Sequence, residues 1–145
     1  MNTFMPYSCF VKSAKCLDRQ RLGKQRVEVM QILDAIANGS RWQNHPAVTM
    51  WRNHELSLCS YGETICREWR KRGYKDTCAP RISAFRDVFR GAYGTPWWLG
   101  SEIFHAAHRA ALLAKAPEWY QQFGWSEPPK IAYFWPKPSG IMVRR

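Results

Sequence analysis

The chain lacks the segments that would send it into or across a membrane. None of the apolar runs in its 145 residues approaches the ~18 to 20 residues needed to span a bilayer. The opening stretch, MNTFMPYSCF, has no basic region followed by an apolar one, so no export signal is visible. We therefore expect a cytoplasmic protein with no membrane partner.

Disulfides and metal-binding motifs are missing as well. The five cysteines form an odd set, which favours reduced thiols over disulfides in a chain without an export signal. Two pairs are seven residues apart, too far for the C-x-x-C spacing of a zinc site, and we favour buried thiols over metal ligands: Cys9 with Cys16, and Cys59 with Cys66. The histidines form no convincing metal set either, so we predict no metal or cofactor and interpret them as core or groove residues: His45, His54, His105 and His108.

Acidic residues are scarce. Eleven Asp and Glu stand against 22 Lys and Arg, which leaves a net charge of +11. Such an excess repels itself and is commonly kept for a polyanionic partner. Nucleic acid is the leading candidate, although an anionic membrane surface, an acidic protein or a merely solvated basic face remain alternatives. The eight tryptophans fit a nucleic acid or a lipid surface, because their rings stack on bases and also sit among lipid headgroups.

The remaining composition is that of a folded globular protein. Apolar residues make up 46% of the chain and charged residues 23%. A length of 145 residues lies within the usual range for one domain with one core. No internal repeat or linker stands out, so we treat residues 1–145 as a single domain.

The first half of the chain predicts two long helices. The first runs from about Ser13 to Ala37, with Ser13 as its cap and Asn38 and Gly39 as its stop. Gly23 weakens this helix by ~1 kcal/mol relative to alanine, so either the helix begins later or something needs room there. A second helix starts at Pro46, capped by Asn44 or His45, and closes before Gly73. The apolar stripes are Leu22, Val29, Leu33 and Ile36 on the first, and Ala47, Trp51, His54, Leu58, Tyr61, Ile65 and Trp69 on the second.

The second half predicts a third main helix from Ser101 to the residue before Pro117, preceded by a loop at residues 94–98. Its inward residues are expected to be Ile103, Ala106, Ala107, Ala110 and Leu113. Residues 80–94 allow a short helix with Phe85, Val88 and Phe89 facing inward. Only residues 130–135, KIAYFW, hint at a strand. The predicted fold class is all-α: a single compact domain of three main helices, with long loops and an aromatic-rich C-terminal segment.

Basic residues gather in two places, and rings gather in a third. Six basic residues lie between Lys12 and Arg26, where Arg21, Lys24 and Glu28 share one helix face. A second cluster consists of Arg67, Arg70, Lys71, Arg72, Lys75 and Arg81. The stretch APEWYQQFGW at residues 116–125 crowds four large rings into seven positions. Basic patches with exposed rings suit phosphate contact combined with base stacking.

Four segments, in order, resemble a known family. They are LDRQRL at residues 17–22 followed by Glu28, ANGSRWQNHP at 37–46, KRGYKDT at 71–77 and PEWYQQFG at 117–124. Together they make the chain similar to the phage pyrimidine-dimer DNA glycosylases with AP-lyase activity, the endonuclease V type, and to their bacterial relatives. The resemblance implies a single all-α domain of three helices. It also implies a bacterial cell or a phage-infected host as the setting, with the protein near the nucleoid.

The resemblance also implies a mechanism in which the chain's own N-terminal amine attacks C1′ of the damaged nucleotide. An imine with the sugar follows, and β-elimination nicks the strand. An α-amine has a reference pKa of ~7.7 to 8.0, so much of it is neutral and nucleophilic near pH 7. Position two is Asn2, whose side chain usually discourages removal of the initiator methionine, so the amine belongs to Met1 or to Asn2. Glu28 matches the family glutamate by position; its plainer interpretation is a surface salt bridge with Lys24.

The implied partner is double-stranded DNA with a damaged or modified base, bound by a monomer. Trp119 and Tyr120 would flank the lesion or its partner base, unless they form a hydrophobic lid over the helices. A UV dimer, an abasic site and a modified pyrimidine all suit such a site. A non-catalytic binder of damaged, modified or distorted duplex DNA is the alternative function, and a structural protein that uses its tryptophans is a third. The residues predicted to bind DNA are Arg19, Arg21, Lys24, Arg26, Arg70, Lys71, Arg72, Lys75, Trp119 and Tyr120.

Overall fold

A computed structural model of the chain describes residues 1–91 and 94–145. It confirms the all-α fold class. In the described ranges the helices are α1 (Phe10–Cys16), α2 (Arg19–Asn38), α3 (Pro46–Thr49), α4 (Glu55–Lys71), α5 (Ala79–Val88), α6 (Glu102–Lys115) and α7 (Pro117–Tyr120), followed by a 3₁₀ turn, η1 (Gln121–Phe123). Two short strands, β1 (Phe134–Pro136) and β2 (Met142–Arg144), pair antiparallel with Trp135 opposite Val143. The strand hint at residues 130–135 therefore holds for its last two residues.

The first predicted helix is wrong in one respect, because it breaks into α1 and α2 at Leu17 and Asp18. Both residues have extended backbone angles there. The break is filled from the far end of the chain: the Asp18 N–H donates to the Tyr120 hydroxyl at 3.0 Å, and that hydroxyl donates back to the Asp18 carboxylate. Ser13 is not a cap but lies inside α1, where its hydroxyl bonds both main-chain groups of Tyr7.

The second predicted helix is also broken, between Met50 and His54. The break contains Asn53 at φ +70°, a left-handed conformation that an interior helical residue does not adopt. The Glu55 side chain accepts the Asn53 N–H at 3.0 Å and so marks the start of α4. The predicted cap of α3 is confirmed, because His45 Nδ1 accepts the Ala47 N–H at 3.0 Å.

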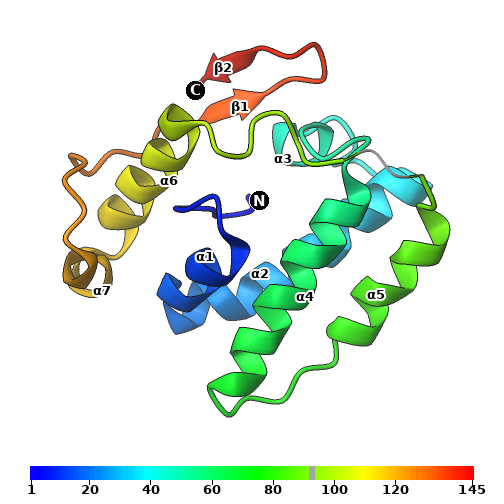
Figure 1. Cartoon of the computed structure of the whole chain (residues 1–145), viewed down its shortest axis with the longest axis horizontal. Helices are drawn as coiled ribbons and strands as arrows, with labels where there is room; N and C mark the ends of the chain where they lie inside the picture. Colours follow the sequence, from blue (N-terminus) through cyan, green and yellow to red (C-terminus); the bar gives the residue numbers. More distant parts are fainter. Residues whose placement is uncertain (92–93) are drawn as a thin grey trace.

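Two glycines allow the main helices to approach closely. A Cβ on Gly62 of α4 would lie 2.7 Å from Val29 Cγ1 of α2, and a Cβ on Gly23 of α2 would lie 2.9 Å from the Trp69 ring of α4. The Trp69 indole is therefore the group that needs room at Gly23. α4 packs on α2 along one side and on α5 along another (Figure 1).

In α5 and α6 the buried faces differ in part from those that the sequence predicted. Val88 is 59% exposed and Ile103 is 54% exposed, so the prediction that both face inward is wrong. On α5 the buried residue is Ile82, with Phe85 and Phe89 packed partly against the core. Ala92 and Tyr93, at the end of the predicted short-helix stretch, lie outside the described residues. The bounds of α6 agree with the prediction.

The N-terminal segment runs through the middle of the fold, with α1, α6 and the β1–β2 hairpin around it (Figure 1). Asn2, Thr3 and Met5 are buried. The Thr3 hydroxyl accepts the Trp51 indole N–H at 3.0 Å, and the Phe4 carbonyl accepts the Tyr61 hydroxyl at 2.6 Å. These contacts hold the first residues at a defined place inside the fold. That place determines which side chains residues 1 and 2 can reach. Among the described residues no helix has the length and apolar character required to cross a membrane.

Candidate active site

The backbone nitrogen of residue 2 meets the predicted catalytic glutamate. The Asn2 N–H donates to Glu28 Oε2 at 2.9 Å. Glu28 comes from the middle of α2, and it is 8% exposed. The contact forms one wall of a cavity of about 290 Å³ lined by Met1, Asn2, Phe4, Gln20, Arg21, Lys24, Gln25, Glu28, Lys115, Ile131 and Tyr133. We call this cavity the Glu28 pocket.

Gln25 holds the first residues in register with Glu28. Its Nε2 donates to the Asn2 carbonyl at 2.7 Å, and its Oε1 accepts the Phe4 N–H at 2.9 Å. The same Oε1 accepts the Tyr61 hydroxyl at 3.2 Å. A single buried side chain thus pairs with the extended segment as a neighbouring strand would. In the sequence Gln25 appears only as a neighbour of the basic helix face, and its spacing does not predict this role.

Two histidines of α6 hold the segment one step further along. Met5 donates its N–H to His108 Nδ1 at 2.9 Å, and its carbonyl lies 2.8 Å from His105 Nδ1. Because His105 Nε2 accepts the Gly100 N–H at 2.9 Å, its Nδ1 carries the proton and donates to Met5. Burial, with His105 beside it, lowers the pKa of His108 to about 3, and burial lowers the pKa of His105. Their interpretation as core or groove residues is confirmed, and both are neutral near pH 7.

The other side of Glu28 faces cations. Lys24 Nζ lies 3.7 Å from Glu28 Oε1, and its side chain is 73% exposed. The salt bridge and the contact with residue 2 therefore exist together, one on each carboxylate oxygen. Arg21 lies one turn earlier and pairs with Asp18 at 3.2 Å, while Lys115 reaches the pocket from the end of α6. The pocket combines one carboxylate with a positively charged rim.

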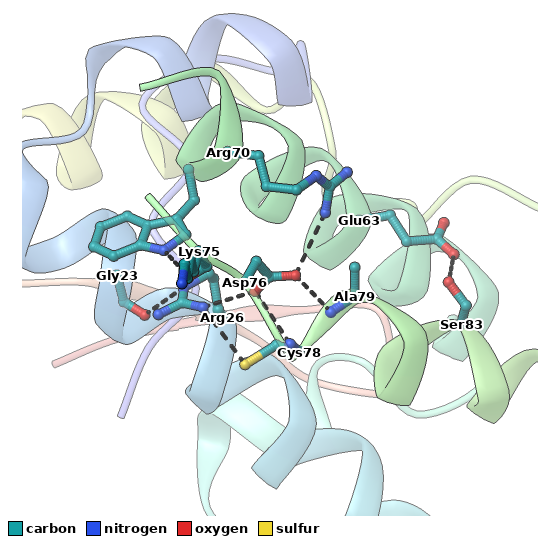
Figure 2. A network of polar contacts seen from close by, with 10 residues as sticks. Gly23, Arg26, Glu63, Arg70, Lys75, Asp76, Cys78, Ala79 and Ser83 are labelled. Atoms are coloured by element: carbon teal, nitrogen blue, oxygen red, sulfur yellow. Dashed lines mark hydrogen bonds and ion pairs between the residues drawn. The ribbon is translucent and has the colours of Figure 1, made fainter. Parts of the chain in front are cut away.

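A second carboxylate, that of Asp76, pairs with two of the basic residues that we had predicted to contact DNA. Its side chain is fully buried, and it pairs with Arg26 at 2.7 Å and Arg70 at 3.4 Å (Figure 2). It also accepts the N–H groups of Cys78 and Ala79 at the start of α5. Burial alone raises the pKa of the Asp76 carboxyl, but the Arg26 guanidinium and these N–H groups together hold it below its usual value.

Arg26 is therefore bound inside the protein rather than held ready for phosphates. Its guanidinium also stacks over the Trp69 ring, 4.4 Å from the centroid. Arg72 is engaged too, by Glu68 at 3.7 Å and by the Ala14 and Lys15 carbonyls at 3.3 and 3.1 Å. The expectation that both contact DNA does not fit these partners. The remaining predicted cations lie at the surface: Arg19, Lys71 and Lys75 are exposed, and half of the Arg70 side chain is.

The two predicted stacking rings take different places. Tyr120 is completely buried, so the expectation that it flanks a lesion does not fit the structure. Trp119 is 38% exposed, and its indole N–H donates to the Cys16 carbonyl at 2.8 Å. Trp119 and Trp69 line a second cleft of about 600 Å³, which shares Gln20 with the Glu28 pocket. Only Trp119 of the predicted pair can offer a face to a base.

The prediction of buried thiols is confirmed for Cys16, Cys59 and Cys66 and is wrong for Cys9. Cys16, Cys59, Cys66 and Cys78 are buried, and Cys9 is exposed. Burial raises the pKa of Cys16 and Cys66 to about 12 and that of Cys59 to about 11, so these groups stay protonated. The described residues hold no group of three or more His, Cys, Asp or Glu placed to hold a metal ion.

Three lining residues of the pocket escaped the sequence analysis because they come from the last third of the chain. Lys115 ends α6, Ile131 lies in the following loop, and Tyr133 directly precedes β1. Nothing in their spacing relates them to residue 2 or to Glu28. Their place depends on the return of the C-terminal hairpin to the N-terminal segment.

Comparison with known proteins adds one finding to this geometry. The model of a family described as pyrimidine dimer DNA glycosylase matches residues 1–81, more than half of the chain. The comparisons gave no match among curated proteins and none among solved structures. The matched segment includes Asn2, Gln25, Glu28 and Asp76, and it ends before Lys115 and Tyr133. The chain belongs to the pyrimidine dimer DNA glycosylase family.

Proposed function

We propose that the protein is a DNA glycosylase with AP-lyase activity, and that the α-amine of Asn2, once Met1 is removed, attacks C1′ of a damaged or modified pyrimidine nucleotide. One observation carries this proposal: the nitrogen in contact with Glu28, at 2.9 Å, is that of residue 2. With Met1 present this nitrogen is an amide without a nucleophilic lone pair. Removal of Met1 would turn this same atom into the α-amine of the chain.

Glu28 handles the protons of the reaction in this proposal. The amine forms a bond to C1′ as the bond from C1′ to the base breaks, and the electron pair leaves with the base. The proton lost by the amine passes through the adjacent carboxylate to the departing base. The bond from C1′ to O4′ then breaks, which opens the sugar ring to a protonated imine, and O4′ keeps the electron pair and takes a proton from solvent. Glu28 removes a proton from C2′, and the 3′ phosphate leaves with the electron pair of the C3′–O bond, which nicks the strand. The carboxylate also offsets the positive charge that develops at the sugar.

The surroundings of the pocket suit a kinked or opened duplex. Lys24, Arg21 and Lys115 line the cavity where phosphates flanking the reacting sugar would lie. Trp119 and Trp69 line the adjoining cleft, where a ring can stack on an unpaired base. The Glu28 pocket, with its cationic rim, thus adjoins the aromatic cleft at Gln20.

Two forms of the protein test the proposal. One retains Met1, and the other begins at Asn2 after cleavage from a removable fusion partner. Each is mixed with duplex DNA that contains an abasic site, in the presence of borohydride. We expect a covalent adduct with the second form and at least a tenfold lower yield with the first, because an amide cannot form an imine.

The site of attachment is then read by mass spectrometry of the trapped peptide, which should carry the sugar on Asn2. Adduct formation through Met1, at full yield in the longer form, would show that the other amine acts. If neither form gives an adduct with abasic, dimer-containing or modified duplexes while both bind them, the protein is a non-catalytic binder of damaged DNA.

A further inference from the structure

The side chain of Asn2 is buried beside the reacting nitrogen with its amide group unused. Asn2 is 6% exposed, and its Oδ1 accepts the Thr3 N–H at 2.8 Å. Its Nδ2 makes no hydrogen bond of good geometry among the described residues, although the amide lies near enough to the Tyr133 phenol to lower the pKa of that group. Most buried polar groups are paired, because burying one without a partner forfeits its hydrogen bonds to water. An unpaired donor that lines a cavity therefore points to an acceptor that arrives with a ligand.

Tyr133 is the second neutral polar group in this part of the pocket. Its ring packs against Phe4 and His108, with centroids 6.4 and 5.6 Å apart. Its main chain exchanges two hydrogen bonds with Arg145, at 2.7 and 2.8 Å, so the hairpin fixes the ring in place. Burial raises the pKa of the Tyr133 phenol more than the neighbouring Asn2 amide and Arg21 lower it. The hydroxyl is therefore protonated at neutral pH and can donate.

The lining of the pocket surrounds these two donors with both charged and uncharged groups. Lys24, Arg21 and Lys115 supply positive charge suited to phosphate oxygens, and Glu28 supplies the one carboxylate. The uncharged remainder is polar at Gln20 and Gln25, of which Gln25 is committed to Asn2 and Phe4, and apolar at Met1, Phe4 and Ile131. Two neutral donors between apolar walls match the edge of an uncharged heterocycle that carries a carbonyl oxygen. A phosphate would be better served by the cations.

We propose, on the basis of the function proposed above, that the Asn2 side-chain amide and the Tyr133 hydroxyl form a two-donor site for the O2 carbonyl of the departing pyrimidine. When the bond from C1′ to N1 breaks, its electron pair moves into the base and places negative charge on N1 and O2. The donors stabilise this charge by hydrogen bonds and transfer no proton. The base takes its proton from the attacking amine through Glu28, so atoms and charge balance.

The site would make the enzyme selective for bases with a carbonyl next to the glycosidic nitrogen. Donors held in place before the reaction stabilise a developing oxyanion without reorganising, and removal of one such donor typically costs about 10²- to 10³-fold in rate. An abasic sugar has no base to release, so its cleavage needs Glu28 and the amine but not this pair. The two substrates therefore separate the donor pair from the rest of the machinery.

The test compares Tyr133→Phe with the wild type, both prepared to begin at Asn2, under single-turnover conditions. One duplex contains a cyclobutane pyrimidine dimer, and a second, otherwise identical, contains an abasic site. We expect Tyr133→Phe to slow trapping and cleavage of the dimer duplex by about tenfold to a hundredfold. The rate on the abasic duplex should change less than threefold. Asn2→Ala, prepared in the same way, keeps an α-amine but lacks the side-chain amide, so its loss of rate should be larger on the dimer duplex than on the abasic duplex.

Tyr7→Phe is the matched control, because its hydroxyl accepts the Trp125 indole N–H at 2.8 Å outside the pocket. It should leave the ratio of the two rates at the wild-type value. Equal losses on both substrates for Tyr133→Phe and Asn2→Ala would show a merely structural role and overturn the donor site. Unchanged rates on both substrates would overturn it as well. If the wild type acts on neither duplex, the proposed function itself fails, which is a different result from either of these.

Discussion

Two acids with buried side chains, Asp76 and Glu28, lie among basic residues in the described part of the chain, and their surroundings differ. Asp76 is surrounded by Arg26, Arg70 and the N–H groups that begin α5 (Figure 2). Glu28 has the residue 2 nitrogen on one oxygen and the flexible Lys24 at 3.7 Å from the other, beside an open cavity. Asp76 is saturated by partners inside the protein, whereas Glu28 faces a largely exposed partner and a cavity.

The difference shows that neither a positive charge nor closeness to Glu28 in the sequence identifies a residue as part of a binding surface. Arg26 is two residues from Glu28 but belongs to Asp76, 50 residues further along the chain. Lys24, four residues before Glu28, is the residue whose charge stays accessible. Because Arg26 stabilises the junction of α2, α4 and α5 through Asp76, it is not available to bind phosphate. The comparison predicts that changes at Glu28 alter activity and changes at Asp76 alter stability.

The largest effect is expected from Glu28→Gln. Glutamine keeps the size and an acceptor for residue 2 but cannot take up the protons of the reaction, so trapping and cleavage should fall by about 10³-fold or more. The midpoint of urea unfolding should shift little. Asp34→Asn, an exposed acid of the same helix, should leave both measurements unchanged. A Glu28→Gln protein that cleaves damaged duplex at the wild-type rate would contradict the assignment of Glu28.

The next largest effect is expected from Asp76→Ala. The change leaves Arg26 without its buried partner and the start of α5 without its acceptor, so the free energy of unfolding should fall by about 3 kcal/mol or more. Urea denaturation followed by circular dichroism measures this loss. At a temperature where the variant is folded, the rate constant on abasic duplex should stay within about threefold of the wild type. A variant that loses activity while keeping its stability would reverse the comparison.

The smallest effect is expected from a fall in pH, which weakens the contact between His108 of α6 and Met5 of the N-terminal segment. His108 has a folded pKa of about 3, against about 6.5 when unfolded, so the unfolded chain binds its proton first as the pH falls. Its contribution to stability is therefore complete above pH 6.5 and is lost progressively down to about pH 3. Between pH 7 and pH 5 this group alone should lower the free energy of unfolding by about 2 kcal/mol.

His108→Asn tests that prediction, because its amide oxygen can accept the Met5 N–H without titrating. The variant should show a pH dependence about 2 kcal/mol weaker over the same interval, with stability again measured by urea denaturation. The Asp76 carboxyl has a lowered pKa, so its stabilising interactions are lost only below its ordinary range near pH 4, outside the interval from pH 7 to pH 5. An unchanged slope in His108→Asn would show that other groups cause the acid sensitivity.

Several features were readable from the sequence because they depend on neighbours along the chain. The stripe of Leu22, Val29 and Leu33 is buried as its spacing indicated. The cap of α3 and the bounds of α6 followed from local signals. The breaks at residues 17–18 and 50–54 did not, because both are imposed by distant packing. The first is occupied by the Tyr120 hydroxyl, 102 residues away, and the second adjoins Trp51, which packs against Trp98.

By itself the sequence determined the helical class and the excess of positive charge, which follow from composition and from periodicity within each helix. The candidate acid at Glu28 came from the resemblance of its segment to a family motif, which is also a local property of the sequence. Only the tertiary structure decided that the residue 2 nitrogen meets Glu28, that Arg26 is occupied by Asp76, and that Tyr133 reaches the same pocket. Each of these is a contact between segments far apart in the chain, and such contacts are fixed by how the helices pack around the buried N-terminal segment.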